Sequence, residues 1–207
     1  AGDLAVTFLG HGSLLFDWAG QRIYVDPYAR VADYTHLPKA GAVLVTHHHA
    51  DHLDARALGA IRTPATVFVV SALARRKLGA GTVMRNGDVR TVAGLQIEAV
   101  PAYNVLHLRE SGRPYHPRGE GNGYVVTFGD TRVYVAGDTE NIPEMSALTD
   151  IAVAFLPMNL PYTMTPEMVA EAARRLRPRV LYPYHTGHTD ADALVRLLAD
   201  LPECEVR

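Results

Sequence analysis

Short apolar segments separated by turn residues run through most of the chain. They consist mainly of valine, isoleucine, leucine, tyrosine and phenylalanine, and glycine, aspartate, asparagine or proline bounds them, which is typical of β-strands. The pattern predicts strands at Ala5–Leu9, Ser13–Trp18, Gln21–Val25, Ala42–Thr46, Thr66–Val70, Leu95–Val100, Tyr124–Phe128, Thr131–Val135, Ile151–Leu156 and Val180–Tyr182.

Helix signals are clearest in three other segments. They are Ser71–Leu78, Pro166–Leu176 and Ala191–Leu201. Thr165 is the expected N-cap of the second segment because Pro166 follows at the first helical position, and Thr189 begins a sequence that resembles a capping box. The chain therefore combines α and β structure.

Two hairpin patterns repeat along the chain. Ser13–Pro27 and Gly123–Asp138 each contain a strand, a glycine turn and a second strand that ends in an aspartate, Asp26 or Asp138. A further apolar strand, a loop and a helix follow each hairpin. We therefore expect one domain of residues 1–207 with two similar halves, about 1–100 and 101–207, packed as helix, sheet, sheet, helix. Loops at matching strand ends would then meet in one cleft.

Composition limits the possible partners. The 207 residues are 48% hydrophobic, enough for one buried core, and the net charge of -2 gives no basic surface for nucleic acid or an anionic membrane. No apolar run approaches the ~18 residues of a membrane helix, and the single cysteine, Cys204, excludes an intrachain disulfide. These features favour a small-molecule substrate. They leave the oligomeric state open.

The chain begins with Ala1 rather than methionine. A signal peptide that has been removed would place the protein in the periplasm, and a cytoplasmic location is equally compatible with the sequence. The compartment therefore stays open at this point.

Ligand-type side chains crowd the stretch Thr46–Asp54, directly after the apolar run Ala42–Val45. His47 and His49 are two residues apart at the end of an extended strand, so they point to the same side. Asp51 and His52 turn back after Ala50. Neutral imidazoles and carboxylates are the ligands that zinc, iron and manganese use in open catalytic sites. A tag remnant or a polar surface would not produce this spacing, and we expect two metal ions rather than one.

The pattern His-x-His-x-Asp-His in Thr46–His52 resembles the signature of the metallo-β-lactamase superfamily. Matching motifs follow in the same order: Gly10-His11-Gly12, Val25-Asp26-Pro27, Ala136-Gly137-Asp138-Thr139 and Tyr184-His185-Thr186-Gly187. The segments starting at Pro101, His116 and Gly121 are similar to a compact bacterial branch of metal-dependent hydrolases, and more distantly to ascorbate-6-phosphate lactonases. The resemblance implies an α+β fold, the four-layer αββα sandwich of this superfamily.

The resemblance also implies a ligand set for two ions. His47 and His49 hold the first ion, and Asp138 bridges it to the second. Asp51, His52 and His185 hold the second ion. Zinc is the expected metal, with manganese and iron as alternatives, and Asp51 and Asp138 are the expected catalytic residues.

The third histidine of the first ion is missing from its usual place, which is Asn104 in this chain. His116, which precedes a proline and a glycine-rich stretch, is our preferred replacement. His107 is the alternative, and Asn104 itself would be a weak ligand or a substrate contact.

Other polar and aromatic residues are open to a functional or a structural interpretation. Asp26 either orients a ligand histidine or caps a turn, and His11 either lines the cleft or is structural. We expect His48 to point away from the ligands. The residues with the weakest claim to a site role are His36, His188, Tyr103 and Tyr162.

This ligand set predicts hydrolysis. A water that bridges two divalent ions loses a proton near neutral pH, and the resulting hydroxide attacks an ester, lactone, amide or phosphodiester. No G-x-S-x-G nucleophile motif is present. The alternatives are a di-iron redox enzyme, although the chain has no cysteine pairs or room for an added redox module, and a non-catalytic metal-binding protein.

Overall fold

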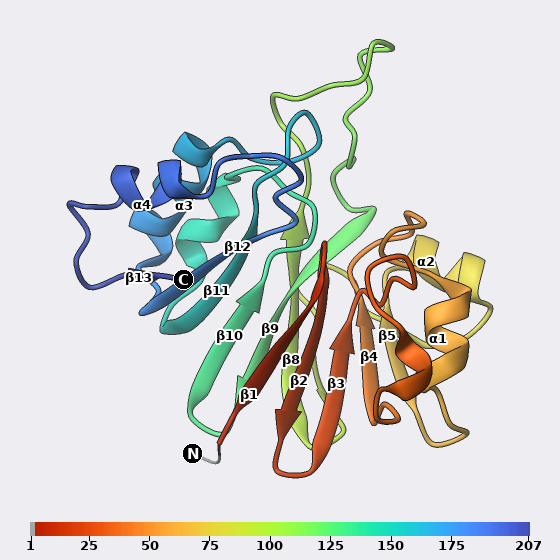
Figure 1. Cartoon of the computed structure of the whole chain (residues 1–207). Helices are drawn as coiled ribbons and strands as arrows, with labels where there is room; N and C mark the ends of the chain where they lie inside the picture. The colour runs from red at the N-terminus through yellow and green to blue at the C-terminus, as the bar shows by residue number, and fades with distance from the viewer. Residues whose placement is uncertain (1–2) are drawn as a thin grey trace.

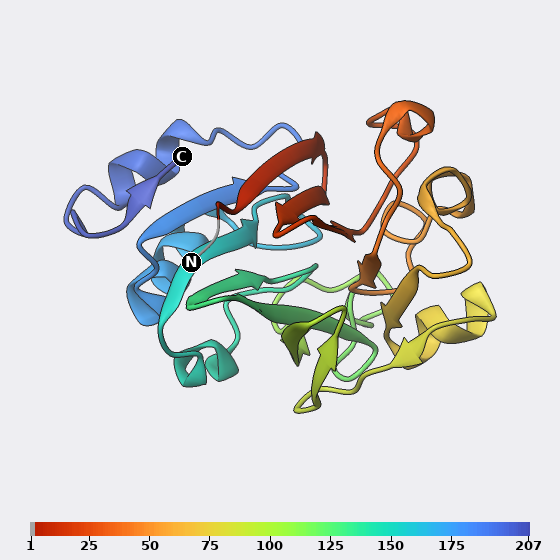
Figure 2. The same cartoon turned by 90° about the horizontal axis from the view of Figure 1, so that it is seen from below.

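The computed structural model describes residues 3–207 and contains two β-sheets that lie face to face (Figure 1, Figure 2). The first sheet has the order β1 (Ala5–Gly10), β2 (Ser13–Trp18), β3 (Gln21–Val25), β4 (Ala42–Val45), β5 (Val67–Val70) and β6 (Thr82–Val83). The second has the order β13 (Glu205–Val206), β12 (Val180–Tyr184), β11 (Ile151–Pro157), β10 (Thr131–Val135), β9 (Gly121–Phe128), β8 (Leu95–Ala102) and β7 (Val89–Val92).

The alternation of side chains along each strand creates three apolar layers. In β3, Ile23 and Val25 pack between the sheets, whereas Tyr24 packs on the outer face of the first sheet. In β10, Val133 and Val135 likewise face the inter-sheet core. Successive side chains of a strand point to opposite faces, so a strand that is buried on both faces must be apolar throughout.

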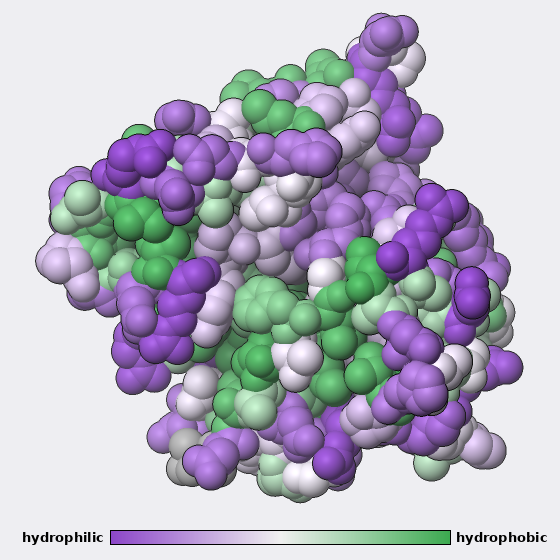
Figure 3. All heavy atoms as spheres, in the orientation of Figure 1, coloured by the Kyte–Doolittle hydropathy of each residue, from purple (hydrophilic) through white to green (hydrophobic). Residues whose placement is uncertain are grey.

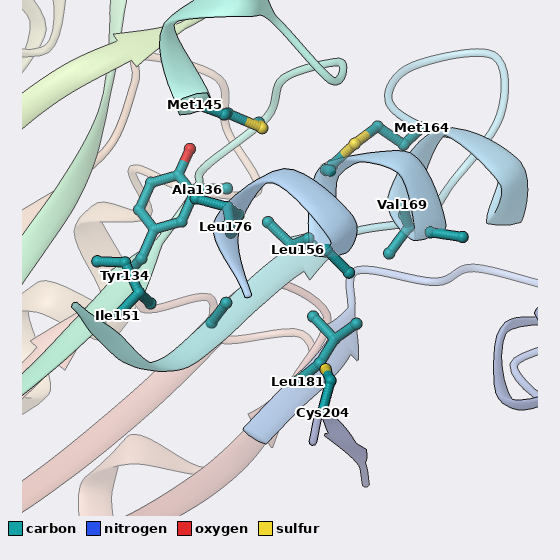
Figure 4. Packing of buried hydrophobic residues seen from close by; sticks show 14 of the residues in the cluster. Tyr134, Ala136, Met145, Ile151, Leu156, Met164, Val169, Leu176, Leu181 and Cys204 are labelled. Atoms are coloured by element: carbon teal, nitrogen blue, oxygen red, sulfur yellow. The ribbon is translucent and has the colours of Figure 1, made fainter. Parts of the chain in front are cut away.

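Helices cover the outer face of each sheet. On the first sheet, α1 (Ala55–Ile61) and α2 (Ala72–Leu78) contribute Leu58, Ile61 and Ala74 to the outer apolar layer. On the second sheet, α3 (Pro166–Leu176) and α4 (Asp192–Leu197) pack with β11 and β12, as Figure 4 shows for the α3 side chains. The expected four-layer αββα sandwich is therefore confirmed.

The edge strand β1 closes one side of the gap between the sheets. The ring of Phe8 lies 5.6 Å from that of Phe155 and 5.0 Å from that of Tyr182, both in the second sheet. Phe8 is still 46% exposed. Figure 3 shows apolar side chains gathered over β1 and its neighbours on this face.

Both predicted hairpins form. β2 pairs antiparallel with β3, and β9 pairs antiparallel with β10. Each hairpin is followed by a parallel partner, β4 beside β3 and β11 beside β10. Sequence patterns therefore located the central strands of both sheets.

Short elements account for most of the differences from the sequence-based expectation. The sequence indicated a helix after Ala42–Thr46 but not the bounds of α1. It did not predict the short strands β6, β7 and β13 or the 3₁₀ helices Tyr34–His36 and Pro143–Ala147. The last helix is shorter than Ala191–Leu201, and its N-cap is Ala191, which makes no side-chain hydrogen bond, so the capping box expected at Thr189 was wrong. Thr165 does cap α3, because its side chain accepts from Met168 N.

Within residues 3–207, none of the helices combines the length and the apolar character that crossing a lipid bilayer requires.

Leu44 tests the contribution of the inter-sheet core to stability. It is 0% exposed between the sheets, so Leu44→Ala leaves a cavity and should lower the free energy of unfolding by about 2–5 kcal/mol. Val67→Ala is the matched control, because Val67 lies on the neighbouring strand and is 36% exposed, and it should cost ~1 kcal/mol or less. Urea unfolding followed by circular dichroism measures both. Equal costs would contradict this account of the core.

Candidate metal centre

The candidate site lies where loops follow the carboxyl ends of strands from both sheets, at the upper end in Figure 1. The loop after β4 begins at Thr46 and ends at Asp54, which caps α1 by accepting from Arg56 N and Ala57 N. Asp138 follows β10, and His185 directly follows β12. The sheet packing therefore brings together residues that are far apart in sequence.

Three residues that directly follow strands near the site, His11, Asp26 and His185, have left-handed backbone conformations that non-glycine residues rarely adopt. The φ angles are 53° at His11, 45° at Asp26 and 49° at His185. Such conformations are costly and are often retained at functional sites. Here all three residues place their side chains in one polar cluster.

The first group consists of His47, His49 and His116, whose ligand-type atoms lie within 4.8 Å of one another. His47 Nε2 is 3.0 Å from His49 Nδ1. His116 comes from the loop between β8 and β9, and its Nε2 lies 3.2 Å from Asp138 Oδ2. A divalent cation could be held by these three imidazoles.

The second group consists of Asp51, His52 and His185, together with His11, within the same distance limit of 4.8 Å. His52 Nε2 and His185 Nε2 lie 3.7 and 3.9 Å from Asp51 Oδ2. His11 Nε2 is 2.9 Å from the same oxygen, so His11 supports Asp51. This group could hold a second cation.

Asp138 lies between the two groups. Its Oδ2 is 3.9 Å from His47 Nε2 and 3.6 Å from His185 Nε2, and its Oδ1 is 3.5 Å from His52 Nε2. The side chain is 5% exposed or less. Its two oxygens are therefore placed to contact cations on both sides.

Unpartnered atoms test whether a metal fits this cluster. Among the described residues, the buried side-chain atoms without a hydrogen-bond partner include three in this cluster, His52 Nε2, His185 Nε2 and Asp138 Oδ1, besides others elsewhere such as Tyr134 Oη. Buried polar atoms without partners are costly and uncommon. All three atoms belong to the candidate ligands, so bound cations would satisfy them, and the residues fit a metal centre.

Asp26 fixes the loop Thr46–Asp54, which carries His47, His49, Asp51 and His52, to the end of β3. This fully buried carboxylate accepts from Thr46 N at 2.7 Å and from Thr46 Oγ1 at 2.6 Å. It is also 2.8 Å from His52 Nδ1. The contact leaves His52 Nε2 facing the cluster, which is how a carboxylate orients a metal-binding imidazole. Of the two interpretations left open by the sequence, the structure shows the orienting contact.

The electrostatics of the cluster favour the cation-binding forms of His47, His49 and Asp138, but not that of His52. Burial lowers the pKa of His47 well below 6.5 and lowers the pKa of His49 to about 4, so both rings stay neutral. Burial acts the same way on His52, but neighbouring carboxylates, Asp138 first, raise its pKa to about 9. Burial would raise the pKa of Asp138, whereas nearby histidines, His185 first, hold it well below its usual range. A cation bound at His52 must therefore displace a proton.

Glycine allows the loops to pack closely at two positions in the site. Gly137 has φ 66°, and a Cβ there would lie 2.9 Å from Asn122 O and 3.0 Å from Thr46 Cβ. A Cβ on Gly12 would lie 3.0 Å from His52 Cε1. Larger residues at these two positions would displace the ligand loops.

The structure separates the three residues considered for the missing ligand. His116 points its Nε2 into the first group. His107 instead has its Nδ1 2.8 Å from Glu140 Oε1. Asn104 Oδ1 accepts from His116 N at 2.8 Å and lies 2.8 Å from His116 Nδ1, so Asn104 contacts the imidazole rather than the cluster.

The remaining histidines lie outside the two groups. His48 belongs to neither group, and its carbonyl accepts from Lys77 Nζ. His36 and His188 are exposed. Sequence reasoning also missed Glu140, which is 1% exposed beneath the loop that carries His116. Nothing in the sequence around Glu140, two residues after Asp138, indicates that it supports that loop.

An open cleft of about 410 Å³ lies in front of both groups. Asp51, Asp138 and Asn159 line it, and Tyr115 and Tyr162, whose rings are 5.0 Å apart, form a wall.

Arg109 also lines the cleft, and its guanidinium lies 4.7 Å from the centre of the Tyr115 ring. The loop of residues 105–115 that carries Arg109 projects above the sheets in Figure 1, and Figure 3 shows that its tip is hydrophilic. The cleft thus combines aromatic surface, a positive charge and the polar cluster, a composition suited to a small polar ligand.

Comparison with known proteins gives consistent matches over most of the chain. Residues 5–185 match the profile of a family described as the beta-lactamase superfamily domain. Over 195 residues the chain is 31% identical to a UPF0173 metal-dependent hydrolase from Methanopyrus kandleri, covering 89% of this chain and 84% of that relative.

Two solved structures are also similar. A candidate metal-dependent hydrolase from Parabacteroides distasonis is 47% identical with a TM-score of 0.95, covering 100% of this chain and 93% of that one. Igni18, a metallo hydrolase from Ignicoccus hospitalis, is 25% identical with a TM-score of 0.81, covering 99% and 94%.

Proposed function

We propose that this chain, which belongs to the metallo-β-lactamase superfamily and is a metal-dependent hydrolase, binds two divalent ions. With them it hydrolyses a bond in a small molecule. The bond is an ester, lactone, amide or phosphodiester. The ions are zinc, with manganese and iron as alternatives. The observation that carries this proposal is the buried Asp138 carboxylate between two groups of ligand-type side chains.

In this proposal each group holds one ion. His47, His49 and His116 hold the first. Asp51, His52 and His185 hold the second, and Asp138 contacts both. Bound divalent ions make water more acidic and polarise the oxygen of the bond under attack.

The residues of the chain supply position and proton transfer. Asp138 lies between the two groups, so in this proposal its carboxylate stands beside the attacking water and accepts its proton. Asp51 Oδ2 faces the open cleft beside His11 Nε2, and its side chain is 37% exposed, so it can pass a proton to solvent. Asp51 and Asp138 are therefore the proposed catalytic residues.

The cleft wall favours a substrate with an anionic group. Among the described residues that line the cleft, Arg109 carries the fixed positive charge, and its contact with Tyr115 holds the guanidinium at the wall. A guanidinium binds carboxylate or phosphate by paired hydrogen bonds. We therefore propose a carboxylate or phosphate on the substrate, away from the bond that is cleaved.

The ligand role of His116 can be tested by metal binding. His116→Ala removes a proposed ligand, so one of two zinc ions should bind far more weakly, beyond the roughly 10- to 100-fold cost of losing an outer partner. His107→Ala should keep both ions, because the ring of His107 contacts Glu140 outside the cluster. Calorimetric titration with zinc measures both variants. If His116→Ala binds two ions as tightly as the wild type, His116 is not a ligand.

The catalytic role of Asp138 predicts a loss of turnover. Asp138→Ala should abolish hydrolysis of any substrate that the wild type cleaves in a panel of nitrophenyl esters, bis-nitrophenyl phosphate and lactones. Asp130→Ala, an exposed residue of the β9–β10 turn, is the control and should behave as wild type. Circular dichroism checks the fold, and rates are compared at equal metal content. Wild-type turnover in Asp138→Ala would remove this residue from the mechanism.

The anion-binding role of Arg109 predicts a selective change in KM. Two probes suit this test: nitrophenyl succinate with a free carboxylate, and its neutral methyl ester. Arg109→Ala should raise KM for the free acid about fivefold, as for an exposed ion pair of ~1 kcal/mol, and leave KM for the methyl ester unchanged. Arg113→Ala is the control, because Arg113 lies in the same loop and pairs with Glu120. An equal change for both substrates would argue against anion recognition.

A further inference from the structure

The loop that carries His116 has little apolar support of its own. Its residues Val105, Leu106 and Leu108 are 52%, 70% and 45% exposed, so hydrophobic burial does not fix the loop. Hydrogen bonds at its base, between the two ends of the loop at Asn104 and His116, must therefore hold it in place. At that base, Asn104 N donates to His116 O at 2.9 Å.

Glu140 anchors the start of this loop from below. Its Oε2 accepts from the backbone N–H groups of Val105 and Leu106, at 2.7 and 2.6 Å. Its Oε1 accepts from His107 N at 2.7 Å and from Asn104 Nδ2 at 3.0 Å. One buried carboxylate thus fixes a run of consecutive residues.

The neighbours of Asn104 determine which way its amide points. The atom that faces Glu140 also lies 2.9 Å from the Tyr162 carbonyl oxygen, which can only accept. That atom must therefore be the amide nitrogen, Nδ2. The other atom, Oδ1, must accept, and it does so from His116 N at 2.8 Å.

The orientation of the amide in turn determines the tautomer of His116. Oδ1 of Asn104 lies 2.8 Å from His116 Nδ1, and an amide oxygen cannot donate, so Nδ1 carries the hydrogen. His116 Nε2 is then the nitrogen left to face His47, His49 and Asp138. That nitrogen is the one a cation in the first group requires.

We propose that Asn104 is a positioning residue: held by Glu140 and the Tyr162 carbonyl, it fixes the tautomer and direction of His116 and so sets the metal affinity of the first group. This inference rests on the proposed function, in which His116 binds a metal. It assigns Asn104 a role as an orienting partner of the imidazole, instead of a ligand or a substrate contact. Carboxylates and carbonyls commonly orient metal-binding histidines in this way.

Two substitutions of Asn104 separate positioning from loop support. Asn104→Leu loses the Nδ2 contacts with Glu140 and Tyr162 and also the acceptor that faces His116 Nδ1. Asn104→Asp keeps that acceptor, and its second oxygen must share a proton with Glu140, because both groups are otherwise acceptors. Asn104→Leu should weaken zinc binding at one position by about 10- to 100-fold. Asn104→Asp should retain most of that affinity. Tyr103→Phe, which loses a contact with Glu144 beside the same loop, is the control and should match the wild type.

Competition titration with a chromophoric chelator measures the zinc affinities of the loaded proteins. The His116 Nδ1–H proton signal in nuclear magnetic resonance gives a second readout: it should be protected from exchange in the wild type and Asn104→Asp and lost in Asn104→Leu. Urea unfolding shows whether each variant is folded.

The outcomes distinguish this inference from the proposed function. The positioning role is overturned if Asn104→Leu binds zinc as tightly as the wild type. It is also overturned if Asn104→Asp keeps the protected Nδ1–H signal and still loses as much zinc as Asn104→Leu, because Asn104 then supports the loop only. Wild-type protein that binds no zinc at the first group would overturn the two-metal proposal, and the positioning role with it.

Discussion

A buried carboxylate surrounded by imidazoles is the constraint on which the site depends. Asp138 and the histidines around it are removed from water, and burying a charge is unfavourable unless opposite charge or hydrogen bonds compensate it. Its Oδ1 and the Nε2 atoms of two neighbours, His52 and His185, are buried with no hydrogen-bond partner. Cations, or protons in their place, would therefore stabilise this end of the two sheets.

The scaffold makes this arrangement possible by placing the polar loops at the same end of an apolar sandwich. Side chains of β3, β4 and β10 alternate between the inter-sheet core and an outer layer, so each strand is fixed on both faces. The loops then leave from rigid strand ends. Asp26 extends this rigidity into the ligand loop, because it joins the end of β3 to Thr46 and His52.

The sequence predicted the parts of the fold that rest on local periodicity. The hairpins, the central strands and α3 follow from alternating apolar residues, turn glycines and the cap at Thr165. The start of helix α1 was missed because its N-cap, Asp54, lies inside the stretch Thr46–Asp54, which was interpreted as a source of metal ligands. The clustering of His47, His49, Asp51 and His52 could be expected from spacing, since all lie in one loop.

The local sequence favoured His116 over His107, but what separates the two in the structure could not be derived from it. That difference depends on Glu140, which is distant in sequence and holds His107 by its backbone and ring, leaving His116 to reach the cluster. The same loop carries Arg109 and Tyr115 on the cleft wall. A change in its base would therefore alter both the position of His116 and the wall of the cleft. Because few apolar contacts hold the loop, its geometry is set by a small number of buried hydrogen bonds, and the position of His116 and the shape of the cleft wall share one structural support.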